Sequence, residues 1–397
     1  MSPPIDFVYI KNEHQLVDYC DRIKGLPLIG FDTEFVSEDR YLPELCLIQV
    51  AAGDDYAIID SLAFQNLDPF WDLLCDEENG HQTVVHAARE EFRFCIGATG
   101  RRPNRLFDCQ VAAGLMGLEF PAAYSNLVNR FCGTSLRKHE TRTNWRKRPL
   151  SREQLQYAIK DVYYLASIHQ QITERLNKLN RIDWLTEEME HRQTEFEREM
   201  DETRWRRLSG IGTASPQDLA VIRELWMWRE KTAEKRDTPA RRVLRDDLLV
   251  ELAKRGTTNL AKIRSIRGMD YGRVQKFLPE ISDAIDQGKN IPKADWPKQA
   301  KKNRIPNLGL LGQFLATALG IICRDESIAP NLAGSTQELR TMAAWRMGMI
   351  ELDEEPRLFT GWRREVIAQK IDAVLEGKKS LRVKNASSNQ PLIMEDC

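Results

Sequence analysis

The chain has 397 residues, which is too long for one ordinary domain and predicts two or three domains, each able to bury its own core. With 42% hydrophobic residues, 29% charged residues and no apolar run of bilayer-spanning length, its composition excludes a membrane-spanning protein. The net charge of −1 hides an asymmetry: residues 1–203 carry 23 Lys and Arg against 34 Asp and Glu, or −11, whereas residues 204–304 carry 24 against 13, or +11. The middle segment therefore has the charge to face a polyanion.

The first part of the chain predicts strands and helices in alternation. The N-terminus has neither the basic stretch nor the apolar core of a secretory signal, so we expect a cytoplasmic protein. A short apolar stretch and an amphipathic helix fill residues 5–27, and residues 28–35 form an apolar strand. The apolar runs 45–51 and 56–60 flank a Gly-Asp turn and predict a hairpin.

The elements that follow predict a mixed sheet with helices on both faces. A long helix starts at Ser151, with Gln154 at the capping-box position. Before it, the shorter predicted elements are the helix 64–75, the strand 83–86, the helix 89–96, the strand 106–108 and the helix 109–117.

Beyond residue 184 the patterns are helical throughout. Residues 184–207 are heavily charged and read as a connector, and the Gly-rich segment 209–216 marks a boundary. A basic linker, 292–306, separates two helical blocks, and the tail after Lys378 is polar. The predicted domains are 1–203, 209–290 and 303–378, followed by a disordered tail, 379–397.

The first long strand presents two carboxylates on one face. Because side chains alternate along a strand, Asp32 and Glu34 point to one side while Phe31, Thr33 and Phe35 point to the other. Two neighbouring acids repel each other, so they either point into water or hold a multivalent cation between them. The pair by itself leaves both possibilities open.

Further acids that can join this pair lie on two helices. Glu91, or its neighbour Glu90, stands at the start of a helix, and Asp161 lies on the helix from Ser151, with Tyr157 one turn earlier. Each has an ordinary alternative as a solvated acid or a half-buried aromatic. The eight cysteines are scattered with no Cys-x-x-Cys pair, so they read as reduced core residues and zinc is not expected.

In their order and spacing these residues resemble the ribonuclease D family, in the tyrosine branch of the DEDD exonucleases. Residues 209–288 resemble the helicase-and-RNase-D C-terminal (HRDC) domain, and the last helical block resembles its more divergent second copy. The segments that carry the resemblance to the exonucleases span about 135 residues and are Phe31-Asp32-Thr33-Glu34-Phe35, Leu45-Cys46-Leu47-Ile48-Gln49-Val50, Val85-His86-Ala87-Ala88-Arg89-Glu90-Glu91, Phe107-Asp108-Cys109-Gln110, Thr141-Arg142-Thr143-Asn144-Trp145-Arg146-Lys147-Arg148-Pro149-Leu150 and Tyr157-Ala158-Ile159-Lys160-Asp161-Val162-Tyr163-Tyr164-Leu165.

The resemblance implies an α/β ribonuclease H-like exonuclease domain, with a mixed five-stranded sheet and helices on both faces, followed by two all-α domains. It also implies a metal-dependent 3′ to 5′ exoribonuclease that releases nucleoside 5′-monophosphates from the 3′ ends of structured RNA, with tRNA precursors as the suggested substrate. We expect the enzyme to be a monomer.

The resemblance further implies a site for two divalent cations, Mg²⁺ or Mn²⁺. Asp32 would bridge both ions, Glu34 and Asp161 would hold the first, Glu91 would support the second, and Tyr157 would orient the attacking water. The family has Asp where this chain has Glu91. The extra methylene makes this ligand longer and less fixed, so metal preference or rate can differ.

The substrate contacts that the resemblance suggests lie mainly in the basic segment before Ser151. Its basic side chains, Lys138 and Lys147 among them, would grip the RNA backbone, an aromatic would stack on a base, and Leu45 would shape the pocket for the terminal nucleotide. The alternative is a solvated basic loop. The full set of expected contacts is Leu45, His86, Arg142, Trp145, Arg146 and Arg148.

The HRDC-like segment would bind structured RNA away from the cut, and its alternative use is a protein–protein contact. Two further functions stay open on the sequence. One is a DNA-directed exonuclease of the same fold. The other is a nucleic-acid-binding scaffold whose exonuclease site is impaired at Glu91.

Overall fold

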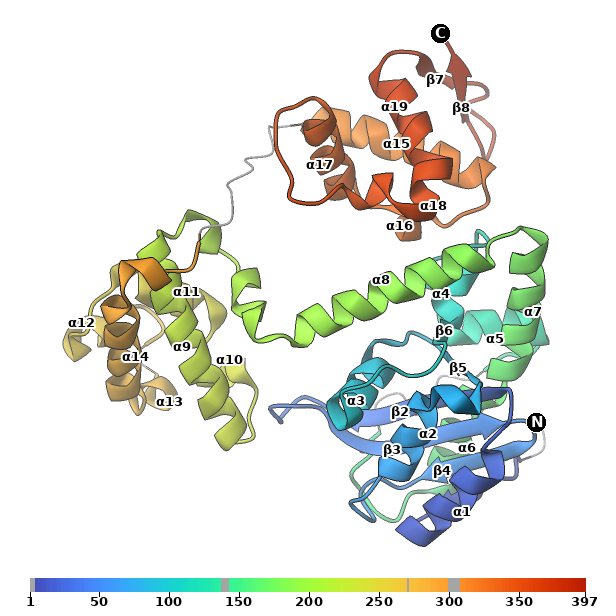
Figure 1. The fold of residues 1–397 in the computed structure, drawn as a ribbon, viewed down its shortest axis with the longest axis horizontal. Coiled ribbons are helices and arrows are strands. Elements are labelled where there is room, and N and C mark those ends of the chain that lie inside the picture. The colour runs from blue at the N-terminus through green and yellow to red at the C-terminus, as the bar shows by residue number, and fades with distance from the viewer. Residues whose placement is uncertain (1–3, 137–142, 270, 299–307) are drawn as a thin grey trace. The chain divides into compact units, whose positions relative to one another are not determined.

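The computed structural model describes residues 4–136, 143–269, 271–298 and 308–397, and the chain divides into two units (Figure 1). The sheet unit comprises Met1–Glu34, Leu47–Thr194 and Asn303–Cys397, and the helical unit comprises Phe35–Cys46 and Glu195–Lys302. Across the described ranges, none of the helices is both long enough and apolar enough to cross a membrane.

Six strands form the main sheet, in the order β1-β4-β3-β2-β5-β6. Strand β1 is parallel to β4, β3 is antiparallel to β4, and β5 is parallel to both β2 and β6, so the predicted mixed sheet is confirmed. The expected count of five strands is wrong, because the two-residue β6 also pairs with β5, Val84 with Phe107 and Val85 with Asp108. The strands are β1 (Val8–Ile10), β2 (Leu28–Val36), β3 (Glu44–Ala52), β4 (Asp55–Ile59), β5 (Gln82–Val85) and β6 (Phe107–Asp108).

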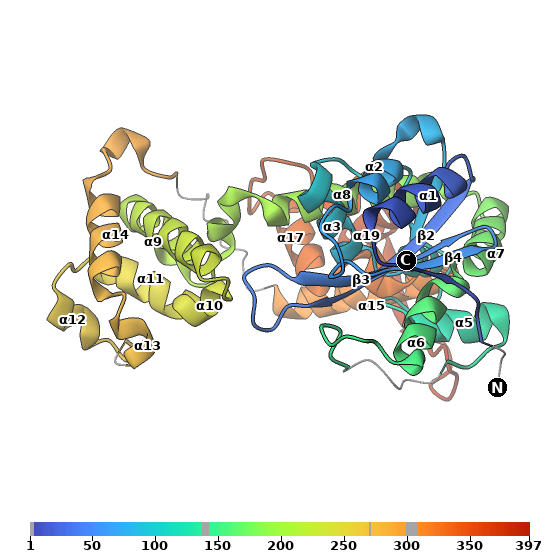
Figure 2. The ribbon, with the colours of Figure 1, turned by 90° about the horizontal axis from the view of Figure 1, so that it is seen from below.

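Helices cover both faces of this sheet, as expected. Figure 2 shows α1 (Glu13–Ile23), α2 (Asp68–Cys75) and α3 (Arg89–Thr99) above the strands, and α5 (Tyr124–Cys132) and α6 (Arg152–Tyr163) below them. The buried ring of Phe31 on β2 packs edge-on against Phe70 and Trp71 of α2, with ring centroids 5.8 and 6.2 Å apart. All eight cysteines are free and six of them are buried, in agreement with reduced core residues.

The helix predicted to run on from Ser151 is interrupted. The capping box of Ser151 and Gln154 is present, and α6 follows it, but a break at Tyr164 separates α6 from α7 (Leu165–Lys178). The short helix α4 (Cys109–Gly114) and α5 both pack on α7, and η1 (Glu77–Asn79) follows α2. The break lets α6 and α7 follow the sheet with separate axes.

The C-terminal helices belong to the sheet unit and pack on α8 (Ile182–Met200). The indole rings of Trp184 on α8 and Trp362 stack with centroids 5.3 Å apart, and the buried carboxylate of Glu188 pairs with Arg363 and Arg357 at 2.9 and 2.6 Å. The elements of this block are α15 (Gly309–Asp325), α16 (Pro330–Ala333), α17 (Thr336–Arg346), η5 (Arg357–Phe359), α18 (Gly361–Arg363), η6 (Arg364–Ala368) and α19 (Gln369–Leu375).

The tail expected to be disordered forms a hairpin instead. Strands β7 (Lys379–Val383) and β8 (Leu392–Asp396) pair antiparallel. Polar composition misled the prediction, because cross-strand ion pairs, Lys379 with Asp396 and Arg382 with Glu395, both at 2.6 Å, join the two strands. A guanidinium N–H of Arg324 on α15 donates to the carbonyl of Leu392 at 2.9 Å and ties the hairpin to the helices.

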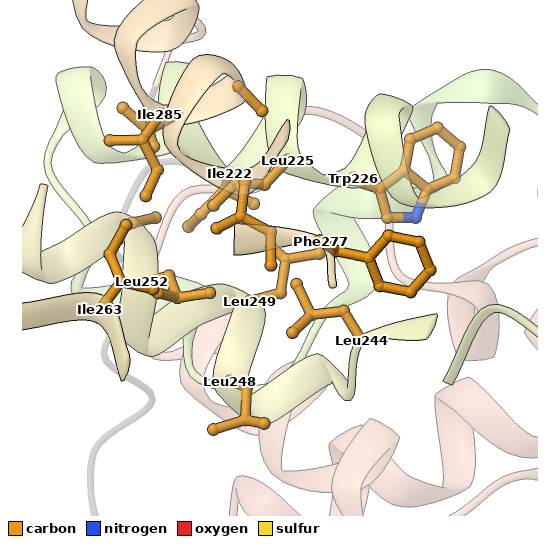
Figure 3. Close-up of a cluster of buried hydrophobic side chains, with 14 of the residues drawn as sticks. Ile222, Leu225, Trp226, Leu244, Leu248, Leu249, Leu252, Ile263, Phe277 and Ile285 are labelled. Atoms are coloured by element: carbon orange, nitrogen blue, oxygen red, sulfur yellow. The ribbon is translucent and has the colours of Figure 1, made fainter. Parts of the chain in front are cut away.

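The helical unit has its own apolar core (Figure 3). Ile222 and Leu225 of α9 pack in one cluster with Leu249 of α11 and Ile285 of α14. Helices α9 and α14 lie so close that a Cβ on Gly288 would sit 2.5 Å from the Cα of Val221. The elements are η2 (Glu202–Arg207), η3 (Ile211–Thr213), α9 (Pro216–Lys235), α10 (Ala240–Val243), α11 (Asp246–Arg255), α12 (Leu260–Arg264), α13 (Gly272–Gln275), α14 (Leu278–Asn290) and η4 (Lys293–Asp295).

The loop between β2 and β3 belongs to this unit as well. Arg40 pairs with Asp237, and the hydroxyl of Tyr41 donates to Glu230 at 3.1 Å. These contacts attach the loop to α9 and to the turn that follows it. The domain boundaries expected from the sequence remain predictions.

Candidate active site

Strand β2 places Asp32 and Glu34 on the face that α6 covers. Phe31 points toward α2 on the opposite face of the sheet. Because side chains alternate along a strand, Asp32 and Glu34 point away from α2. Gly30, two residues before Asp32, allows a close approach on this face, because a Cβ there would lie 3.2 Å from Cδ1 of Leu165. Glycine at this position therefore lets the corner between α6 and α7 approach the strand.

Helix α6 brings Asp161 and Tyr157 over the same face. Asp161 is half-buried near the end of the helix, four residues before Leu165, which contacts β2. Tyr157 lies one turn earlier, and its ring packs against that of Trp145 with centroids 6.2 Å apart. The capping box at Ser151 fixes the start of the helix and with it the height of both side chains above the sheet.

Glu91 reaches the site from α3. It is only 5% exposed, and its Oε1 accepts a 2.7 Å hydrogen bond from the hydroxyl of Thr33. The start of α3 is held by Asp108, whose carboxylate accepts the backbone N–H groups of Ala87 and Ala88, each at 3.0 Å. Ala87 has a φ of 65°, in the left-handed region that is costly for a residue with a Cβ, and these hydrogen bonds hold it there.

The carboxylate cluster, defined here as Asp32, Glu34, Glu91 and Asp161, carries like charges with little water around them. Desolvation, with the charges of the other three members, raises the pKa of Asp32 well above its ordinary value. Desolvation and the charges of Asp161 and Glu91 raise the pKa of Glu34 to about 8. Desolvation also raises the pKa of Asp161 and of Glu91 to about 7, although the hydrogen bond from Thr33 works against the shift at Glu91. The charges of Glu91 and Asp161 therefore act on both carboxylates of strand β2.

These side chains have the chemistry of a site for hard divalent cations. Their donors are carboxylate oxygens, the ligands that Mg²⁺ and Mn²⁺ prefer, and a cation would remove the repulsion that raises their pKa values. Within the described ranges, no three His, Cys, Asp or Glu side chains converge closely enough to hold one ion as they stand. Side-chain rotations, at Glu91 above all, would have to accompany binding, since one of its oxygens is engaged by Thr33.

Of the expected substrate contacts, His86 is half-buried and Trp145 is buried. His86 packs edge-on against Tyr124 with ring centroids 5.4 Å apart; burial lowers its pKa, and its Nδ1 has no hydrogen-bond partner among the described residues. Trp145 is 4% exposed and covers Tyr157, so its indole supports the tyrosine and is not presented as an open platform for a base. Leu45, on β3, is half-buried.

The basic segment is only partly available for RNA. Arg148 makes a two-pronged ion pair with Asp60, at 2.6 and 2.7 Å, and also donates to the carbonyl of Trp145 at 2.6 Å. Burial works to raise the pKa of Asp60, but the hydrogen bonds from Arg148 and Tyr9 outweigh it and lower that pKa. Arg148 thus anchors the segment to the end of β4.

The other basic side chains of the segment differ in exposure, and two of them lie outside the described residues. Arg146 is half-buried, and its backbone N–H donates to the side chain of Asn144 at 3.0 Å. Lys147 is exposed, whereas Lys138 and Arg142 lie outside the described residues.

Sequence reasoning missed three supporting residues. Thr33 was assigned only to the far face of β2, and the packing of α3 that brings it to Glu91 has no sequence signal. Tyr124 donates its hydroxyl to the carbonyl of Lys160 at 3.2 Å, next to Asp161. Asp108 caps α4 by accepting the N–H of Gln110 at 2.8 Å, and an Asp directly before a predicted helix was a usable signal.

Comparison with known proteins agrees with these features. Residues 7–177 match the family model described as 3′–5′ exonuclease, and residues 218–285 match the HRDC domain. Ribonuclease D of Gluconacetobacter diazotrophicus is 32% identical over 95% of each chain, and that of Zymomonas mobilis is 31% identical over 98% of each. Among solved structures, Escherichia coli RNase D, described as an exoribonuclease involved in structured RNA processing, superposes with a TM-score of 0.81 at 23% identity, covering 94% of this chain and 99% of its own. The catalytic core of RRP6 from Trypanosoma brucei superposes with a TM-score of 0.52 at 18% identity, covering 71% of this chain and 79% of its own.

Proposed function

Because the chain belongs to the ribonuclease D family, we propose that its carboxylate cluster is the hydrolytic centre of a 3′ to 5′ exoribonuclease that requires divalent cations. The family assignment makes the chain an exoribonuclease, and the proposal concerns where and how it acts. The observation that carries it is the raised pKa of all four members of the cluster, each caused first by desolvation. A group of buried like charges is costly unless something positive binds there, which is typical of a functional site.

The roles of the residues follow from their positions. Asp32 and Glu34 stand on the rigid strand β2 and supply the fixed ligands, and Asp161 faces them from α6. When bound, Mg²⁺ or Mn²⁺ would neutralise the attacked phosphate and acidify a water molecule. Glu91 is the most adjustable ligand, since it must exchange its hydrogen bond with Thr33 to reach an ion.

Tyr157 has a separate role, because its side chain carries a hydroxyl and not a carboxylate. We assign it the task of orienting the attacking water, and Trp145 fixes the plane of its ring. Tyr124 keeps the end of α6 in place through the carbonyl of Lys160, so the separation between Tyr157 and the strand is held from two sides. The product would be a nucleoside 5′-monophosphate released from the 3′ end.

The proposed substrate is structured RNA with a single-stranded 3′ end, tRNA precursors in particular. Residues 204–304 carry the net charge of +11 that a domain needs to bind RNA at a distance from the cut. The enzyme would act as a monomer in the cytoplasm, with Lys147 and Arg146 contacting the backbone of the incoming strand.

The direct test is digestion of a 5′-labelled tRNA precursor with a 3′ extension, in the presence of Mn²⁺ or Mg²⁺. We expect stepwise shortening from the 3′ end with release of 5′-monophosphates, and slower degradation of a DNA oligonucleotide of matched sequence. Equal rates on RNA and DNA would favour the DNA-directed alternative. If no mononucleotide appears with either metal, the chain is a binding scaffold and the proposal is wrong.

A further inference from the structure

Gln49, on strand β3, is a buried polar side chain without an evident role in the fold. Its relative exposure is 0%, and neither amide atom, Nε2 or Oε1, has a hydrogen-bond partner among the described residues. Burial of an amide with both ends unsatisfied is rare in native proteins because it costs free energy that an apolar side chain would not. Such a residue needs an explanation from function or from an enclosed water molecule.

The strand pairing places Gln49 beside Asp32. Strands β2 and β3 are neighbours in the sheet, and the seven residues between them are too few for a parallel crossover, so the two strands are antiparallel. A Cβ built on Gly30 lies 3.5 Å from the carbonyl oxygen of Ala51. Moving two residues forward on β2 and two back on β3 leads from this contact to Asp32 and Gln49.

The side chain of Gln49 also points to the same face as the carboxylate cluster. Ala51 is paired with Tyr56 of β4, and the ring of Tyr56 packs against Tyr163 of α6 with centroids 5.2 Å apart. Gln49 shares the face of Ala51 because strand side chains alternate. This is the face that α6 covers, where Asp161 meets Asp32 and Glu34.

We propose that Gln49 is a positioning residue that holds the carboxylate of Asp32 in the orientation needed to bind a cation. Its Nε2 donates to Asp32 through a water molecule buried with the pair, and its Oε1 accepts from a water molecule in the same site. A neutral amide suits this task, since it orients a carboxylate without cancelling the charge that attracts the metal, as Lys or Arg would. The inference rests on the proposed function, because it assumes that Asp32 is a metal ligand.

The test is the affinity of the protein for Mn²⁺, measured by calorimetry without RNA, in Gln49→Leu and in Gln49→Met. Loss of an outer hydrogen-bond partner of a metal ligand typically costs about 10–100-fold in affinity. We expect a loss of this size, together with an unchanged or higher Tm for the metal-free protein, because an apolar side chain removes the cost of burying the amide. Gln49→Met keeps the length of the side chain and covers the case in which Leu does not fit.

A matched control is Gln193→Leu, on α8. Gln193 is 7% exposed with an unpartnered Oε1, so the same substitution is made at a second buried glutamine in the sheet unit, outside the carboxylate cluster. We expect its Mn²⁺ affinity to equal that of the wild type. Unchanged Mn²⁺ affinity in both Gln49 variants, with Asp32→Asn abolishing binding, would overturn the inference and leave the proposed function standing. If Asp32→Asn itself binds Mn²⁺ normally, the proposed function fails first.

Discussion

Glu188 and the carboxylate cluster, both in the sheet unit, are desolvated acids with opposite electrostatics. Glu188 on α8 is 1% exposed and meets three guanidinium groups, those of Arg192, Arg357 and Arg363, at 2.6 to 3.0 Å. Burial would raise its pKa, but these three charges lower it to about 2. In the carboxylate cluster no cationic side chain pairs with the acids among the residues that the structure describes, and desolvation raises their pKa values to about 7 or 8 or, at Asp32, well above the ordinary value.

The opposite pKa shifts distinguish an acid that stabilises the fold from acids that form a binding site. At Glu188 the chain supplies the balancing charges itself, so the interaction between α8 and the C-terminal helices is complete. At the carboxylate cluster the balancing charge has to come from outside, and the folded protein stores repulsion that a bound cation relieves. An acid that is costly for folding and an acid that stabilises the fold can thus be told apart by the sign of the pKa shift.

The largest expected effect comes from Asp32→Asn. We predict that it lowers kcat by about 10³-fold, near 4 kcal/mol of transition-state stabilisation, because it removes a central ligand charge. It also removes one of the like charges, so the metal-free variant should unfold at the same temperature as the wild type or a few degrees higher. Single-turnover RNA digestion and a thermal melt measure both.

Asp18→Asn is the control for a general change of charge, since Asp18 on α1 is exposed and pairs only with His14 at 2.9 Å among the interactions described. Its activity should match that of the wild type. An Asp32→Asn enzyme with normal kcat would remove the carboxylate cluster from the mechanism.

The second effect is on stability and comes from Glu188→Gln. Loss of this charge leaves Arg363, itself 2% exposed, without its carboxylate, and breaking a buried pair on one side costs about 3–5 kcal/mol. Urea unfolding should show this loss, whereas the RNA-cleaving rate of the folded fraction should stay near the wild-type value.

Glu190→Gln, on the same helix, is the matched control. Glu190 is 67% exposed and pairs with Arg102, so its loss should cost less than about 1 kcal/mol. Equal losses in the two variants would contradict the distinction between buried and exposed pairs.

The third effect is a dependence of stability on pH. An acid whose pKa is raised on folding binds protons more tightly in the folded state. Its contribution to folding stability is therefore fully present below the unfolded pKa and is lost as pH rises to the folded pKa. The ordinary pKa values are 4.5 for Glu34 and Glu91 and 3.8 for Asp161, and the folded values are about 8, 7 and 7, so the metal-free Tm should fall by a few degrees as pH rises from about 4.5 to 8. Glu188 has the opposite sign, and its contribution is lost only below pH 4.5, toward its pKa of about 2.

Saturating Mn²⁺ gives the comparison for this experiment, because the bound charge should abolish this fall in Tm while leaving other titrations unchanged. A wild-type Tm that has the same pH profile with and without metal would mean that the carboxylates do not bind it.

Much of the sheet and part of the site could be predicted from the sequence, because the signals are local. Alternation in β2 put Asp32 and Glu34 on one face, and the capping box at Ser151 located the helix of Tyr157 and Asp161. The helix was expected to continue past Tyr164, since apolar spacing does not record a bend of the backbone.

What could not be predicted depends on contacts between distant segments. Arg148 was expected to grip RNA, but its bond to Asp60 joins residues 88 positions apart, and no local pattern reveals it. The same holds for Thr33 and Glu91, separated by 58 positions. The hairpin β7–β8 was missed because charge suggested disorder, although charges of opposite sign in register stabilise it.

The smallest expected effect concerns Glu91, the position at which the resemblance to the family leads us to expect Asp. We predict that Glu91→Asp keeps kcat at the wild-type value or raises it severalfold, because the shorter side chain no longer reaches Thr33 and its carboxylate is freed for a cation. The lost hydrogen bond, 2.7 Å long in the wild type, should lower stability by about 1 kcal/mol. Thr33→Val removes the same hydrogen bond without shortening the side chain of Glu91. If Glu91→Asp and Thr33→Val both bind Mn²⁺ more tightly than the wild type, and by similar factors, Thr33 holds Glu91 away from the metal. A drop in kcat for Glu91→Asp comparable to that of Asp32→Asn would instead mean that the length of Glu91 is itself required, and that this chain has rebuilt its site around the longer acid.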